Sequence, residues 1–250
     1  MIAEPTIIVT LDVDWAADWM IEMAAEVLVE RGVKATWFIT HESPSLETLR
    51  KEPLFELGWH PNFLPNSSHG ETPEAVLTFC QGLVPEARSV RTHSLCQSER
   101  HLSLMVEAFN IKNDCSIYLP VDSAIDAHSV GYSENGPKLT RVPHFFQDNM
   151  HMYTGKSWDL SRSMLERTGV LVFCFHPVHI ALNSLNMAQY EETKREMNIS
   201  TIKKEDLPPI DHSSSGAGKL FRDVADYAST MSAATLNEYC ESWRSGKIDG

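Results

Sequence analysis

The stretch TIIVTLDVD, at residues 6–14, joins an apolar run to two carboxylates that stand one residue apart. Residues i and i+2 of an extended strand share a face, so Asp12 and Asp14 point the same way. Two acidic side chains held side by side repel each other, and a metal ion, another cation or a shared proton must offset that repulsion. The stretch therefore predicts a strand with a charged site at its carboxyl end.

Further β-rich runs follow at residues 35–40, 55–60, 89–92, 116–119, 139–143 and 170–175, with helical patterns at 18–31, 73–82, 99–109 and 158–167. Strands that alternate with helices form parallel βα units, and their sheet is buried on both faces. About seven such units in one domain favour a closed or nearly closed α/β barrel. The first strand is not followed by GxGxxG, which argues against a dinucleotide-binding sheet.

We expect one catalytic domain over residues 1–250, with its core at about residues 5–180. Residues 198–218 are rich in charged residues, Pro, Ser and Gly, and this composition predicts an exposed, mobile loop. Two closing helices within residues 219–244, at about 219–229 and 234–244, are expected to complete the chain.

The formal net charge of −13 argues against nucleic acid or an anionic membrane surface as a partner. Residues 1–5 lack the features of a signal peptide, and no run approaches the roughly 18 apolar residues of a membrane span. The five scattered cysteines, without a CxxC pair, predict reduced thiols in a cytoplasmic protein.

Ionisable residues stand at the predicted strand ends, where α/β barrels build their active sites. Two imidazoles and one carboxylate can hold a divalent metal ion and leave a position open for water, which makes His60 and His69 candidate ligands. Arg91 could hold a metal-free aspartate ionised and oriented. His176 is placed to act as a general acid, because imidazole changes its charge near neutral pH.

Several candidates also have a purely structural interpretation. The aspartate pair could cap a helix, and Arg91 could lie at the surface. Asp148 could orient His176 or contact a substrate, and Phe145 could stack on a sugar or pack in the core. His179 is a neighbour of the site or a loop residue.

These motifs together resemble the polysaccharide deacetylase superfamily, carbohydrate esterase family 4, with its NodB-type domain. The resemblance covers about residues 5–180 and rests on Asp12-Val13-Asp14, on the strand KATWF at 34–38, on His60, on Arg91, and on Phe-His-Pro around His176. It implies a distorted (β/α)7–8 barrel. The sequences HPNF at 60–63 and HPVH at 176–179 are similar to the WbmS-like branch, which is linked to bacterial surface polysaccharides.

The resemblance also implies roles for individual residues. Asp12 would be the general base, Arg91 its partner and His176 the general acid. The implied ligands of a divalent ion, first of all zinc and otherwise cobalt, nickel or manganese, are Asp14, His60 and His69. The candidate substrate neighbours, which rest on their positions in the sequence, are His93, Asp148, Phe145 and His179.

One position departs from the family pattern. The family places a second histidine four residues after the first, and residue 64 is Leu. Either His69 reaches back across the Pro-rich loop to complete the site, or the metal ion is lost or weakly held.

The resulting hypothesis is a metal-dependent hydrolase that removes an N-acyl group, first of all N-acetyl, from an amino sugar in bacterial O-antigen or lipopolysaccharide biosynthesis. A cytoplasmic enzyme would act on a nucleotide-linked, lipid-linked or oligosaccharide substrate. The alternatives are a hydrolase of a small amide or cyclic ureide, and a metal-free, inactive carbohydrate-binding homologue, which Leu64 motivates. No oligomeric state follows from the sequence.

Overall fold

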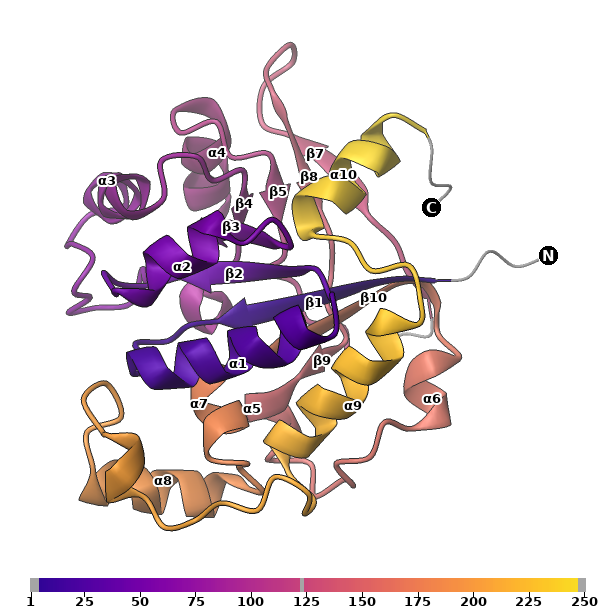
Figure 1. Ribbon diagram of the computed structural model, residues 1–250. Helices are drawn as coiled ribbons and strands as arrows, with labels where there is room; N and C mark the ends of the chain where they lie inside the picture. Colours follow the sequence, from indigo (N-terminus) through magenta and orange to yellow (C-terminus); the bar gives the residue numbers. More distant parts are fainter. Residues whose placement is uncertain (1–4, 122–123, 247–250) are drawn as a thin grey trace.

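The computed structural model describes residues 5–121 and 124–246, and its strands form one curled sheet (Figure 1). The strands are β1 (Thr6–Asp12), β2 (Ala35–Ile39), β3 (Phe55–Trp59), β4 (Ser89–Val90), β5 (Asn113–Asp114), β6 (Ala124–Ile125), β7 (His128–Gly131), β8 (Lys138–Arg141), β9 (Phe146–Gln147) and β10 (Thr168–Phe175). Their order is β6-β10-β1-β2-β3-β4-β5-β8-β7, and β9 pairs with β10. The expectation about a signal peptide falls largely on residues 1–4, outside the described residues.

The described strands pair in parallel, except that β7 runs antiparallel to β8. The two end strands, β6 and β7, do not pair with each other in the described part of the chain, so the sheet curls without closing. The expected distorted α/β barrel is confirmed in this open form. Its parallel strands bring their carboxyl ends to one edge.

The helices are α1 (Asp18–Glu30), α2 (Ser45–Lys51), α3 (Pro73–Leu83), α4 (Glu99–Glu107), α5 (Asp148–His151), α6 (Arg162–Leu165), α7 (Pro177–Ala181), α8 (Met187–Glu196), α9 (Ala217–Ser229) and α10 (Leu236–Arg244). Helices α1, α7 and α9 pack against one another. In the described residues, no helix combines the length and hydropathy that crossing a bilayer requires.

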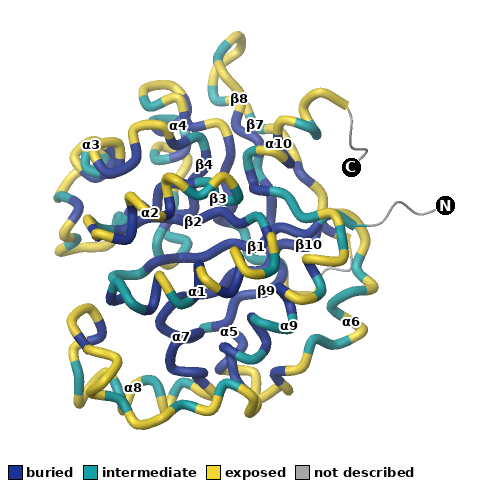
Figure 2. Tube along the Cα trace, in the orientation of Figure 1, coloured by how far each residue is buried: buried dark blue, intermediate teal, exposed yellow. Residues whose placement is uncertain are grey.

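The core lies along the central strands, which are dark blue in Figure 2. Ile7, Ile8 and Val9 of β1 are fully buried, because helices cover one face and the curled sheet encloses the other. Burying one such side chain stabilises the fold by about 1.5–3 kcal/mol. The apolar run therefore fixes β1 at the centre of the sheet. Asp12 and Asp14 follow this run and lie at the carboxyl end of the strand.

Two predicted elements are wrong in position or length. The strand expected at 116–119 is replaced by β5 at Asn113–Asp114, because Asn113 takes the place beside Ser89 and Thr140 in the sheet. The helix expected at 158–167 shrinks to α6. Trp158 is instead buried and donates its indole N–H to the carbonyl of Leu185 at 2.9 Å.

The loop predicted at 198–218 is not exposed along its whole length. Ile199 and Ile202 are buried, and the indole N–H of Trp19 donates to the carbonyl of Ile202 at 2.8 Å. This part of the segment therefore packs against α1. The closing helices form as expected, as α9 and α10.

Helix α10 lies against the sheet on the side of β5 and β8 (Figure 1). The carboxylate of Glu56 accepts hydrogen bonds from the Asn237 N–H at 2.9 Å and the Thr36 hydroxyl at 2.8 Å. The hydroxyl of Ser89 also donates to this carboxylate. Glu56 thus satisfies an otherwise unpaired N–H in the first turn of α10.

We predict that Glu56→Ala lowers the free energy of unfolding by about 1–3 kcal/mol, because it leaves partly buried donors without an acceptor. Urea unfolding followed by circular dichroism measures the loss. The control is Glu26→Ala on the exposed face of α1, which should change the free energy by no more than about 0.5 kcal/mol. Equal stability of the two variants would contradict the assignment.

Candidate active site and metal centre

Ionisable side chains from several strands meet at the carboxyl ends of the parallel strands. Asp12 ends β1, His60 follows β3, Arg91 follows β4 and His176 follows β10. Asp148 joins them from the first turn of α5, directly after β9. These five side chains are buried, so each charge among them needs a partner.

Asp12 is paired with Arg91. The guanidinium donates from Nη1 to Asp12 Oδ1 and to the Thr10 hydroxyl, each at 2.8 Å, and from Nε to the carbonyl of Cys115 at 3.0 Å. Burial raises the pKa of Asp12, but Arg91, His60 and His176 together outweigh that effect and hold the pKa below its usual value. Asp12 is therefore an ionised carboxylate whose second oxygen, Oδ2, accepts only a weak hydrogen bond from the Cys174 thiol at 3.4 Å.

The chain turns sharply after β1. Asp14 and Trp15 have positive φ angles of 46° and 54°, a conformation that non-glycine residues seldom adopt. The Trp15 N–H donates to the Thr40 hydroxyl at 3.1 Å, and the Val13 N–H donates to the carbonyl of Phe38 at 3.1 Å. Strained backbone of this kind often accompanies functional sites. The turn places the Asp14 carboxylate in front of the strand ends.

Asp14, His60 and His93 form a close triangle of donor atoms. Asp14 Oδ1 lies 3.1 Å from His60 Nε2 and 3.0 Å from His93 Nδ1, and the two ring nitrogens are 3.3 Å apart. In a tetrahedral site with bonds of about 2.0–2.2 Å, neighbouring ligand atoms lie about 3.3–3.6 Å apart. The triangle is thus close to one face of a tetrahedral metal site, and its nitrogen and oxygen donors suit a divalent transition metal.

The electrostatics of Asp14 agree with its place in the triangle. Burial raises the pKa of Asp14, but the hydrogen bonds to His60 and His93 hold it well below its usual range. A carboxylate that stays ionised is the form in which aspartate binds metal ions.

His176 and Asp148 form a second buried pair. Asp148 Oδ1 lies 2.6 Å from His176 Nδ1, and Oδ2 accepts the His176 backbone N–H at 2.7 Å. Burial lowers the pKa of His176, but Asp148, Asp14 and Asp12 together outweigh that effect and raise the pKa to about 9. The other nitrogen, Nε2, lies 3.9 Å from Asp12 Oδ2 and 3.5 Å from Asp14 Oδ2. A protonated imidazole therefore faces the two aspartates.

His69 lies outside the donor triangle. Its Nδ1 accepts the Asn62 N–H at 3.2 Å, and its ring stacks on Phe79 at 4.6 Å. Trp15 packs against both His69 and His93. These contacts hold the His69 ring away, and His93, expected as a substrate neighbour, takes the place beside Asp14 and His60. Leu64 is partly exposed in the loop after β3.

Two further expected substrate neighbours lie behind the site. Phe145 is buried, packs edge-on against Phe173 and lines a separate pocket of about 380 Å³, not the one over Asp14 and His93. His179 is also buried, and burial lowers its pKa to about 4. Its ring packs between His176 and Tyr190, so it supports the site from within.

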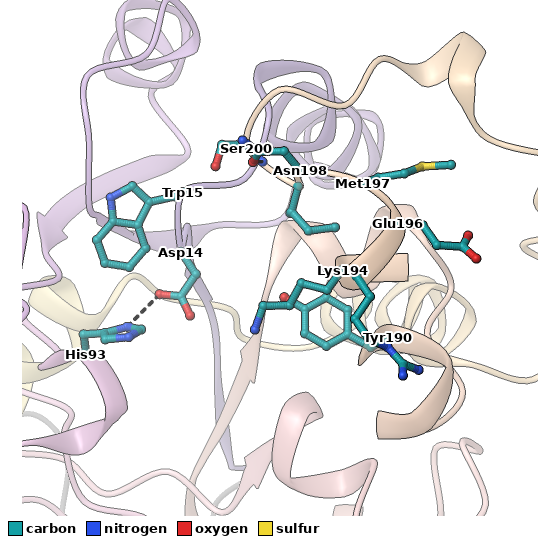
Figure 3. Close-up of a pocket in the computed structure, with 11 residues that line it drawn as sticks. Asp14, Trp15, His93, Tyr190, Lys194, Glu196, Met197, Asn198 and Ser200 are labelled. Atoms are coloured by element: carbon teal, nitrogen blue, oxygen red, sulfur yellow. Dashed lines mark hydrogen bonds and ion pairs between the residues drawn. The ribbon is translucent and has the colours of Figure 1, made fainter. Parts of the chain in front are cut away.

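A pocket of about 640 Å³ opens over Asp14 and His93 (Figure 3). Trp15 lines it on the side of β1, and Tyr190 and Lys194 of α8 line it on the opposite side. The sequence analysis missed these α8 residues, which lie beyond the core expected at 5–180. Asn186 is the N-cap of α8 and accepts the Gln189 N–H at 3.0 Å. An asparagine of this kind predicts the start of a helix, but not which of the helix's side chains face the pocket.

The family model described as WbmS-like polysaccharide deacetylase matches residues 9–194. The crystal structure of a protein from Bordetella bronchiseptica, described as a candidate polysaccharide deacetylase involved in O-antigen biosynthesis, superposes with a TM-score of 0.77 and 30% sequence identity. The alignment covers 89% of this chain and 90% of that one. No curated protein matches the sequence. The chain therefore belongs to the WbmS-like family of polysaccharide deacetylases.

Proposed function

We propose that the protein is a metal-dependent deacetylase that hydrolyses the N-acyl group, first of all N-acetyl, of an amino sugar in bacterial O-antigen biosynthesis. The observation that carries this proposal is the convergence of a metal-like donor triangle, an ionised carboxylate and a protonated imidazole at one strand edge. Metal-assisted hydrolysis of an amide can use these three chemical groups together. The O-antigen assignment rests on the relative from Bordetella bronchiseptica.

Asp14, His60 and His93 would hold the divalent ion, with zinc as the first candidate and cobalt, nickel or manganese as alternatives. A divalent ion at this place would polarise the acyl carbonyl and lower the pKa of a water molecule. His93 supplies the second imidazole that Leu64 does not. This favours an active enzyme over the metal-free, inactive homologue that the departure at residue 64 suggested.

The protein side chains would then move the protons. Asp12, held by Arg91, accepts a proton from the attacking water on the oxygen that Arg91 leaves available. His176, held by Asp148, gives its proton from Nε2 to the departing amine. The two groups begin in the required protonation states, because Asp12 is ionised and His176 is charged at neutral pH.

The pocket favours a sugar over a small amide or ureide. Its volume of about 640 Å³ exceeds the need of a small amide, and it presents the rings of Trp15 and Tyr190 from opposite sides. Aromatic faces are suited to the apolar C–H faces of a pyranose ring. A cytoplasmic, nucleotide-linked or lipid-linked sugar fits this proposal. Assays of acetate release from N-acetylated sugars and of ammonia or amine release from small amides separate the two substrate classes.

The metal set can be tested by elemental analysis. His93→Gln should weaken zinc binding about 100-fold or more, since loss of a group that only orients a ligand already costs about 10–100-fold. His69→Gln is the matched control and should retain about one zinc per chain after dialysis. Loss of zinc from the His69 variant with retention in the His93 variant would reverse the assignment.

The base can be tested separately from the metal ion. Asp12→Asn keeps the shape of the side chain but removes the proton acceptor, so the turnover number should fall about 10²–10⁴-fold. Zinc content should be retained, because Asp14, His60 and His93 are unchanged. Acetate release and metal analysis measure the two effects, and circular dichroism verifies folding. Full turnover by this variant would exclude Asp12 as the base.

The charge on His176 predicts a pH-dependent stability. Its pKa of about 9 exceeds the ordinary value of about 6.5, so its contribution is fully present below pH about 6.5 and is lost as the pH rises through about 9. Because Asp14 and Asp12 supply part of the shift, Asp148→Asn should cost at most about 3 kcal/mol at pH about 6, and the cost should shrink towards pH about 10. Urea unfolding of chelator-treated protein measures both. A cost that is constant with pH would contradict the ion pair.

A further inference from the structure

Helix α8 forms one wall of the pocket, although none of its residues is buried. In Figure 3, Tyr190 and Lys194 lie together across the pocket from Asp14, Trp15 and His93. The ring of Tyr190 packs edge-on against His179 at 4.5 Å, which fixes the position of the helix relative to the catalytic centre. The Lys194 ammonium lies 5.6 Å from the centre of the Tyr190 ring. An ammonium group therefore stands beside the surface on which a sugar ring would rest.

Lys194 is not committed to a strong partner among the described residues. Its ion pair with Glu191, at 3.6 Å, joins two side chains that are about half exposed, and such pairs contribute little. Arg195 and Glu196 also line the pocket, and the carboxylate of Glu196 points away from Asp14 in Figure 3. Lys194 therefore offers a positive charge to whatever occupies the pocket.

This local charge is the opposite of the charge of the whole protein. The chain carries a formal net charge of −13, with 21 Lys and Arg against 34 Asp and Glu. Salt at physiological strength screens exposed charges beyond about 8 Å, so the groups in the pocket and not the distant carboxylates decide what binds there. A divalent ion on Asp14, His60 and His93 would add to the positive charge.

We propose that the natural substrate is an anionic amino sugar, and that Lys194 binds its negative group while Trp15 and Tyr190 hold its ring. This inference rests on the proposed function and adds the substrate class. Two sources supply the same chemistry: a carboxylate on the sugar ring, as in a uronic acid, or a phosphate at the anomeric carbon, as in a nucleotide-linked or lipid-linked sugar. Lys194 determines specificity and takes no part in the proton transfers.

The experiment compares sugars that differ only in charge. Calorimetric binding to the zinc-loaded protein is measured for N-acetylglucosamine, its uronic acid, its 1-phosphate and its uridine diphosphate derivative. Because carboxylates and phosphates can also bind zinc, the decisive variant is Lys194→Met, which keeps an apolar stem and removes the charge. The control is Lys51→Met, at the exposed end of α2.

In the wild type, at least one anionic sugar should bind more tightly than the neutral sugar. Lys194→Met should reduce that preference about 10–100-fold, the size expected for a charge-assisted hydrogen bond. Lys51→Met should change the preference less than about twofold, as a distant screened charge would. Preference for the uronic acid identifies a ring carboxylate, and preference for the phosphorylated sugars identifies an activated precursor.

Two results overturn the inference: no anionic sugar binds more tightly than the neutral one, or the preference survives in Lys194→Met. Failure of the proposed function looks different. Tight, Lys194-dependent binding of an anionic sugar without acetate release from any of them would refute deacetylation and leave the anion site standing. Acetate release without a preference for charged sugars would support deacetylation and refute the anion site.

Discussion

The structure depends on two neighbouring carboxylates at the end of one central strand, the buried Asp12 and the partly buried Asp14. A buried charge without a partner costs several kcal/mol, and two like charges on one face repel in addition. The protein compensates each carboxylate differently. Arg91 neutralises Asp12, and the imidazoles of His60 and His93 surround Asp14. This difference separates a group suited to move a proton from a group suited to bind a metal ion.

Compensation of this kind requires the parallel sheet. The partners follow β3, β4 and β10, which are distant in sequence and meet β1 only because parallel strands end at the same edge. Because β1 pairs with β10, His176 at the end of β10 lies beside the two aspartates. Strand β9 also pairs with β10, and Asp148, which follows β9, therefore lies next to His176. At the far side of the sheet, Glu56 fastens α10 to the fold. The candidate site thus lies at the carboxyl ends of the strands, and the contact between Glu56 and α10 lies away from it.

The sequence predicted the strands with long apolar runs well. Strands β1, β2 and β3 begin at the expected residues and end within one residue of expectation, because continuous burial demands continuous apolar side chains. It failed for β5, whose two residues, Asn113 and Asp114, are polar and carry no hydrophobic pattern. It also failed for residues 158–167, where the burial of Trp158 outweighs helix propensity.

The sequence by itself determined the fold class, the central strand and most of the candidate site, namely Asp12, Asp14, His60, Arg91, His176 and Asp148. These residues stand at strand ends, and a strand end has a known direction in a parallel barrel. Only the tertiary structure decided that His93 and not His69 joins the donor triangle, and that Tyr190 and Lys194 of α8 face it. Loops and surface helices have no such fixed direction. Their side chains are placed by contacts, such as those of His69 with Phe79 and of Tyr190 with His179, that no spacing along the chain encodes.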